Sequence, residues 1–101
     1  MIKNFRTYSI AVEFYKEIQA LKLPRHLHEQ CQRASSSIAL NLAEGSGRAT
    51  KADQGRFFSI AFGSLRECVA ILDLVTAESK LMELADKLAA HIYKLVEHCR
   101  R

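Results

Sequence analysis

Residues 51–77 read KADQGRFFSIAFGSLRECVAILDLVTA, and this stretch decides the fold of the chain. Apolar side chains recur along it at steps of three and four residues, which is the spacing of one face of an α-helix. One apolar stripe consists of Phe58, Ala61, Leu65, Cys68, Val69, Leu72 and Val75. A second stripe, about a quarter turn away, consists of Phe57, Ile60, Ser64, Ile71 and Leu74. A helix with two apolar stripes is expected to be covered on two sides.

The cover on the second side can come from another copy of the chain, because a domain of 101 residues has a limited interior to offer. The alternative is that this is the central helix of a monomer. We favour the homo-oligomer. The predicted interface residues are Phe57, Ile60, Ile71 and Leu74.

Three other segments carry one apolar stripe each at the same spacing. We therefore expect four helices, over about residues 5–22, 25–44, 51–77 and 80–99. Short connections between helices place sequential helices side by side and antiparallel. The predicted fold class is all-α, an antiparallel up-down four-helix bundle, as a single domain over residues 1–101.

Recognisable residues mark the ends of these helices. Pro24 separates the first two, because proline disfavours the helical conformation in the residue before it. Glycine in a left-handed cap is expected to end the second helix within residues 45–47. Thr50 is predicted to cap the third helix together with Asp53, and Ser79 is predicted to cap the fourth.

Composition excludes several classes of protein. Four Gly and one Pro are too few for a β-rich fold, which needs frequent turns. No window approaches the roughly 18 consecutive apolar residues of a membrane-spanning helix. The first residues start no long apolar run, so no signal peptide is expected. We expect a cytoplasmic protein without a membrane partner.

A modest positive charge is compatible with a nucleic-acid partner. Fifteen Lys and Arg against eleven Asp and Glu give a net charge of +4, although a small soluble domain can carry this charge for solubility alone. Basic side chains near helix ends would contact phosphates, so RNA binding should tolerate sequence changes and depend steeply on salt. The candidate residues are Arg25, Arg48, Lys51, Arg56, Arg100 and Arg101.

The sequence carries no pattern of a metal site. Cys31, Cys68 and Cys99 are never spaced as CxxC and fall within apolar helical patterns, so they are expected to be reduced core residues. His26 and His28 lie two residues apart and point to different faces of a helix. No metal and no cofactor are expected.

Enzyme signatures are also missing from the sequence. The glycines at residues 45–47 lack the GK[ST] of a phosphate-binding loop, and the serines at residues 35–37 have no nearby histidine. No histidine follows an arginine at the spacing often found in small helical ribonucleases. A non-enzymatic protein is therefore expected.

A polar stripe runs along the second predicted helix and continues onto the third. Its residues are Gln30, Arg33, Ser37, Asn41 and Glu44, joined by Ser64 and Glu67. The structural interpretation pairs Arg33 with Glu67 and lets Asn41 bond to Ser64 or to helix backbone, which would fix the register of the two helices. The alternative interpretation is a polar pocket for a ligand or for RNA.

Two motifs lie on the second and third predicted helices. The first reads Gln30-x-x-Arg33-Ala34-x-x-Ser37-Ile38-x-x-Asn41-Leu42-Ala43-Glu44-Gly45-x-Gly47-Arg48, and the second reads Phe58-x-Ile60-Ala61-x-Gly63-Ser64-Leu65-x-Glu67. Together they resemble the 23S rRNA-intervening sequence protein family, over roughly residues 5–99. The resemblance implies an antiparallel four-helix bundle, assembly into a homopentameric ring, and RNA or ribosome-associated binding without established catalysis.

The chain departs from the family pattern at one place. The stretch from Pro24 to Gln30 is about one helical turn shorter than is usual in the family. A family ligand contact at the tip of this first hairpin is therefore not carried over to this chain.

A second functional hypothesis belongs to a different class. The accessory protein of diversity-generating retroelements is similar in shape, a pentameric bundle that binds nucleic acid and a reverse transcriptase. The alternative function is accordingly a protein-binding scaffold. Survival of a protein contact after removal of RNA separates this hypothesis from RNA binding.

Overall fold

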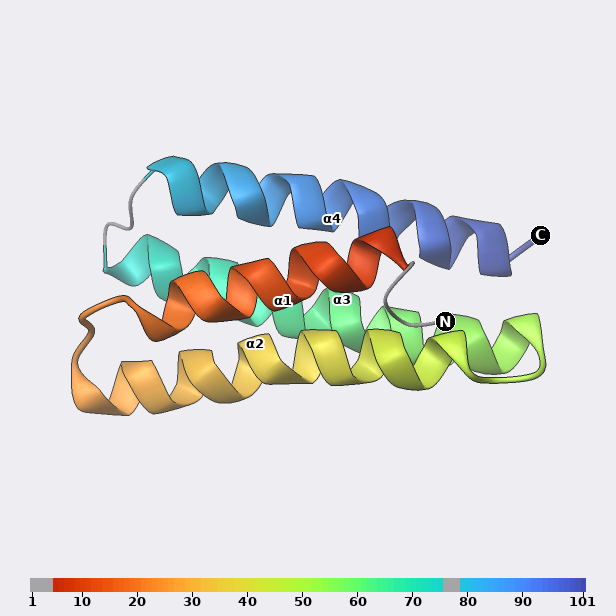
Figure 1. Ribbon diagram of the computed structural model, residues 1–101, viewed down its shortest axis with the longest axis horizontal. Coiled ribbons are helices and arrows are strands. Elements are labelled where there is room, and N and C mark those ends of the chain that lie inside the picture. Colours follow the sequence, from red (N-terminus) through yellow and green to blue (C-terminus); the bar gives the residue numbers. More distant parts are fainter. Residues whose placement is uncertain (1–4, 76–78) are drawn as a thin grey trace.

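The computed structural model describes residues 5–75 and 79–101, and these ranges form four helices without a strand. They are α1 (Arg6–Gln19), α2 (Arg25–Ser46), α3 (Lys51–Leu74) and α4 (Ser79–Cys99). Consecutive helices run in alternating directions along the long axis of the bundle (Figure 1). The predicted all-α four-helix bundle is confirmed.

The alternation gives the bundle two distinct ends. At the first, here named the basic end, α2 ends, α3 begins and α4 ends (Figure 1). At the opposite end α1 ends, α2 begins, α3 ends and α4 begins. Residues near positions 48, 56 and 100 therefore come together in space although they lie far apart in the sequence.

The C-terminal ends of three predicted helices differ from the structure, and the first and fourth helices start within one residue of the predicted position. The first helix ends at Gln19 rather than at residue 22, because the chain extends before Pro24. The second continues through Ser46, and the third ends at Leu74. The prediction for residues 76 and 77 lies outside the described residues.

The helix caps follow the prediction in part. The Thr50 hydroxyl accepts a hydrogen bond from the Asp53 backbone N–H at 3.1 Å, so the predicted cap of α3 is confirmed. The Asp53 carboxylate forms an ion pair with Arg56 instead of completing a capping box. The predicted left-handed glycine cap of α2 is wrong, since Gly47 has φ −93° in the right-handed region. The predicted cap by the Ser79 side chain lies outside the described residues.

A single apolar core joins all four helices. Its largest members include Phe14, Ile18, Ile38, Leu42, Leu65, Leu72, Leu88 and Ile92. Cys31 and Cys68 lie in this core as free thiols, and Cys99 is a half-buried free thiol. A hydrogen bond from Cys68 to Cys31, together with burial, raises the pKa of the Cys68 thiol, so this thiol stays protonated.

Glycines bring α3 close to its two neighbours. A Cβ on Gly45 would lie 2.7 Å from Phe58 Cε1 and 3.1 Å from Phe57 Cβ, so the absent side chain makes room for α3 against α2. A Cβ on Gly55 would lie 2.9 Å from Cys99 Cβ, so α4 approaches α3 in the same way. These two glycines serve helix packing rather than turns.

We predict that Gly45→Ala lowers the free energy of unfolding by about 1–2 kcal/mol. The added methyl group would overlap the ring of Phe58, which is only 5% exposed and has no room to move. The gain of about 1 kcal/mol in helix propensity offsets the overlap only in part. Urea unfolding followed by circular dichroism measures the difference.

The matched control is Gly47→Ala, two residues along the chain. Its Cβ would lie 3.7 Å from the Glu44 carbonyl oxygen, which is an ordinary contact, and its φ suits alanine. This variant should change the free energy of unfolding by less than about 0.5 kcal/mol. Equal effects of the two variants would contradict the close packing of α2 on α3.

Candidate nucleic-acid interface

Positive charge gathers at the basic end of the bundle. Arg25 begins α2 at the opposite end, but the other predicted nucleic-acid residues come together (Figure 1). The residues at the basic end are Arg48, Lys51, Arg56, Arg100 and Arg101. Helix topology produces this cluster, because it brings the start of α3 beside the end of α4.

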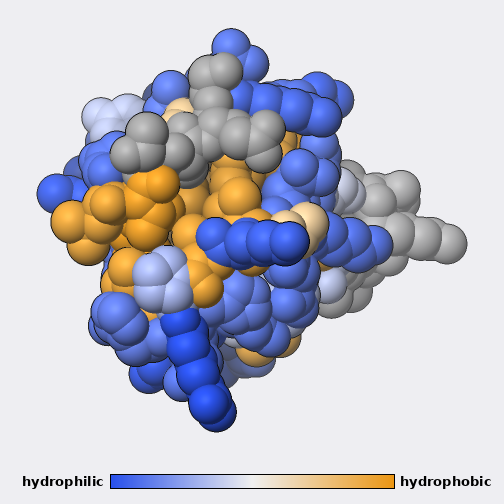
Figure 2. All heavy atoms as spheres, turned by 90° about the vertical axis from the view of Figure 1, so that its left-hand side faces the viewer, coloured by the Kyte–Doolittle hydropathy of each residue, from blue (hydrophilic) through white to orange (hydrophobic). Residues whose placement is uncertain are grey.

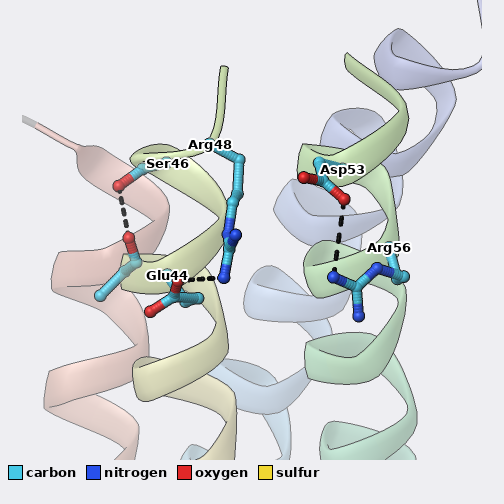
Figure 3. A network of polar contacts seen from close by, with 6 residues as sticks. Glu44, Ser46, Arg48, Asp53 and Arg56 are labelled. Carbon is cyan, nitrogen blue, oxygen red and sulfur yellow. Dashed lines mark hydrogen bonds and ion pairs between the residues drawn. The ribbon is translucent and has the colours of Figure 1, made fainter. Parts of the chain in front are cut away.

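Local ion pairs neutralise part of this charge. They join Arg48 Nη2 to Glu44 Oε2 at 2.6 Å, Arg56 Nη2 to Asp53 Oδ1 at 3.5 Å, and Arg100 Nη1 to Glu97 Oε2 at 3.3 Å. Figure 3 shows the first two pairs on the facing helices α2 and α3. Such solvated pairs contribute at most about 1 kcal/mol each. Within the described ranges Lys51 and Arg101 form no ion pair, so their charges are uncompensated.

Two arginines pack on one aromatic ring at this end. The Arg48 guanidinium carbon lies 4.6 Å from the centre of the Phe57 ring, and that of Arg56 lies 4.4 Å from it. Gln54 Nε2 donates to the Arg48 carbonyl oxygen at 3.1 Å, which ties the connection between α2 and α3 to the first turns of α3. The sequence pattern predicts an oligomer interface for Phe57 and does not predict its contact with the arginines.

A shallow groove between α3 and α4 opens near the same end. One part, of about 240 Å³, is lined by Ser59, Phe62, Tyr93, Val96 and Arg100. The adjoining part, of about 220 Å³, reaches Lys51. Tyr93 is 57% exposed. The groove thus combines an exposed aromatic ring with basic residues at its edge, a combination suited to nucleic acid.

Further positive charge lies between α1 and α4. Partial burial, followed by the charges of Arg6, Lys87 and Lys94, lowers the pKa of His91. Lys87, His91 and Lys94 share one face of α4, which their spacing in the sequence shows, whereas only the tertiary structure brings Arg6 to them. This group is not among the residues predicted from the sequence. Lys94 also lines a hollow with Arg101.

The opposite end has a different character. Figure 2 looks onto this end and shows apolar side chains gathered there. Leu21, Leu23 and Leu27 are half-buried at this end, and Leu74 is 74% exposed. Apolar surface therefore distinguishes this end from the basic end.

The polar stripe forms a short seam between α2 and α3. Ser37 Oγ and Ser64 Oγ lie 2.9 Å apart, and Asn41 Nδ2 donates to Ser37 O at 2.9 Å and to Ser37 Oγ at 3.1 Å. The predicted bond from Asn41 to helix backbone is therefore present. This Ser37–Ser64 seam joins the two helices by neutral hydrogen bonds, which supports the structural interpretation over a ligand pocket.

The predicted pair of Arg33 with Glu67 is not formed. Both side chains are exposed, and neither takes part in an ion pair within the described ranges. Water satisfies both charges at the surface, so nothing compels them to pair. Gln30 is also exposed, and Glu44 bonds to Arg48 rather than to the seam.

The predicted interface residues of α3 divide between core and surface. Ile71 is 5% exposed and belongs to the core of its own bundle, so it has little surface to offer a second copy. Ile60 and Leu74 are 44% and 74% exposed, and Phe57 is half-buried. Ile60, Gly63 and Leu74 lie on the side of α3 that faces away from the core, named here the outer face of α3.

No part of the described structure gathers three metal-binding side chains, so the histidines near residue 26 and the cysteines do not converge on one point. None of the helices in the described ranges is long and apolar enough to cross a membrane.

Comparison with known proteins supports the resemblance of the two motifs. A family model described as 23S rRNA-intervening sequence protein matches residues 3–101. Comparisons with curated proteins and with solved structures return no match. The match covers nearly the whole length of the four-helix bundle, so the chain belongs to the 23S rRNA-intervening sequence protein family.

Proposed function

We propose that this chain is a non-enzymatic, homo-oligomeric helical bundle that binds RNA through its basic end. The observation that carries the proposal is the gathering of Arg48, Lys51, Arg56, Arg100 and Arg101 at one end of the bundle. Charges placed together attract a polyanion more strongly than charges scattered over the surface.

Assembly would multiply the electrostatic attraction. A ring of five copies, the number that the family resemblance implies, would carry a net charge of about +20. Lys51 and Arg101 would then present an uncompensated pair of positive charges from each copy. Such binding depends on phosphates and tolerates different RNA sequences.

The outer face of α3 supports assembly. Ile60 and Leu74 expose apolar surface about four helical turns apart on this face. Gly63 lies between them, and no atom lies within 4 Å of where its Cβ would be. Glycine inside a helix costs about 1 kcal/mol relative to alanine. A helix from a second copy could pack closely against α3 at Gly63, where no part of its own chain does so.

Catalysis is not part of the proposal. The polar side chains of the Ser37–Ser64 seam are two hydroxyls and an amide, which are half-buried and bond to one another. An amide is no base for activating a hydroxyl nucleophile. The seam therefore holds the helices together.

Removal of two uncompensated charges should weaken RNA binding. We predict that Lys51→Ala with Arg101→Ala raises the Kd for structured RNA several-fold at low salt. The slope of log affinity against log salt should fall by about 0.7–0.9 for each lost phosphate contact. Filter binding of the wild type and the double variant over rising salt measures both quantities.

The matched control removes two charges away from the basic end. Lys16→Ala with Lys22→Ala changes the net charge equally, at exposed positions in the last turn of α1 and just beyond it. It should leave both Kd and slope close to wild type. Wild-type affinity that is absent at low salt or flat with salt contradicts RNA binding. Equal losses in both double variants contradict the assignment to the basic end.

Assembly should depend on the outer face of α3. We predict that the wild type has the mass of a homo-oligomer in light scattering. Ile60→Asp with Leu74→Asp should give a folded monomer, because two buried carboxylates would oppose the contact. Retained helical circular dichroism confirms that the fold survives.

The comparison variant is Leu40→Asp on α2, a residue that is 67% exposed outside the outer face of α3. It should keep the wild-type mass. A monomeric wild type contradicts assembly. A monomeric Leu40→Asp variant beside an assembled double variant contradicts the choice of α3.

The second candidate, a protein-binding scaffold, draws on the groove between α3 and α4. Exposed Tyr93 and half-buried Phe62 line this groove, and such rings are common in protein interfaces. Pull-downs with and without nuclease separate the two functions. A protein that stays bound after complete RNA digestion favours the scaffold, and loss of all bound material favours RNA.

A further inference from the structure

Two guanidinium groups from different segments lie over the ring of Phe57. Arg48 follows α2 and lies 4.6 Å from the ring centre, whereas Arg56 belongs to α3 and lies 4.4 Å from it. The side chains of both arginines keep contact with solvent, with exposed fractions of 39% and 58%. The cluster of Arg48, Phe57 and Arg56 is named here the arginine–phenylalanine stack.

Both arginines of the stack also form ion pairs. Glu44 Oε2 forms an ion pair with Arg48 Nη2 at 2.6 Å, and Asp53 Oδ1 forms one with Arg56 Nη2 at 3.5 Å (Figure 3). These ion pairs neutralise the positive charges of the two guanidinium groups. Each guanidinium group lies over the Phe57 ring, and the exposed fractions of the two arginine side chains leave part of their surface open to a ligand.

Arg48 also has an unused hydrogen-bond donor. Its Nε is buried and has no hydrogen-bond partner among the described residues. Buried donors normally find an acceptor, so an unpaired one requires an explanation. A small shift of the Arg48 side chain toward a ligand that carries acceptors would satisfy it.

We infer that the arginine–phenylalanine stack receives an unpaired base of single-stranded RNA on the outward face of Arg48 or Arg56. This inference rests on the proposed RNA binding and adds to it a preference for unpaired over duplex RNA. Bases splayed out of a helix stack on arginine planes and aromatic rings, whereas paired bases are covered by their neighbours in the duplex.

The carboxylates favour a base over a phosphate at this position. Glu44 and Asp53 already neutralise the two arginines and would repel a phosphate that approached the same edges. A base carries no net charge and approaches the planes instead. Phosphate contacts then fall to Lys51 and Arg101, which have no ion pair in the described ranges.

The test compares an unstructured oligoadenylate with a fully paired RNA duplex of the same nucleotide count. Wild-type protein should bind the oligoadenylate more tightly at equal salt. Arg48→Lys with Arg56→Lys keeps both positive charges but removes the flat planes, so affinity for the oligoadenylate should fall about tenfold. Affinity for the duplex should stay close to wild type. A fluorescent adenine analogue in the oligonucleotide should lose emission on wild-type protein, because stacking quenches it.

Arg66→Lys is the matched control, an exposed arginine of α3 outside the stack. It should bind both RNAs as the wild type does. Phe57→Leu provides a second variant that keeps apolar volume and removes the ring. The adenine analogue should emit more strongly on this variant than on the wild-type protein. Light scattering and circular dichroism establish that the variants retain fold and assembly.

The outcomes separate this inference from the proposed function. A wild type that binds neither RNA overturns both. A wild type that binds both RNAs equally, or a double lysine variant that weakens both equally, overturns base stacking and leaves phosphate-based RNA binding in place. If a variant loses its fold or assembly, base stacking is judged from the wild type alone, by its preference for the oligoadenylate over the duplex and by the emission of the adenine analogue. Undiminished emission then overturns the stack as a base-binding site.

Discussion

The close approach of α3 to α2 at Gly45 is the contact on which the rest of the structure depends. The missing side chain of Gly45 lets the Phe58 ring seat directly against α2. Phe57, the residue before Phe58, then lies near the surface between the helices, where it contacts Arg48 and Arg56. A bulkier residue at position 45 would separate α2 from α3 and, with them, the two arginines from their shared ring.

Antiparallel topology turns a weak charge excess into a local one. The chain has a net charge of +4, and its basic residues are scattered along the sequence. Alternating helix directions place the loop before α3 beside the last turn of α4, so basic residues about 50 positions apart become neighbours (Figure 1). Local carboxylates hold three of these arginines in place, whereas Lys51 and Arg101 keep their full charge. The residues that are held in place by ion pairs thus differ from the residues whose positive charge is free to attract an anion.

The two apolar stripes of α3 differ in burial. The first stripe packs in the core, and Ile71 of the second stripe joins it. Ile60 and Leu74 keep exposed surface. The cover that the sequence predicts for the second side of α3 is therefore expected over these two residues and over the space beside Gly63. Periodicity gives the angle of a residue around its own helix. Whether a residue at the edge of an apolar stripe is buried depends on how much of the helix surface the neighbouring helices cover.

By itself the sequence determined the helices, their order, the core stripes and the family, because each depends on local spacing and on short connections. It also indicated the bond from Asn41 to helix backbone, four residues away on the same helix. Only the tertiary structure decided that Arg33 and Glu67 stay apart, that Ile71 is buried, and which basic residues share an end. Those outcomes depend on distances between helices and on competition with water, and neither quantity is contained in the spacing of residues along one helix.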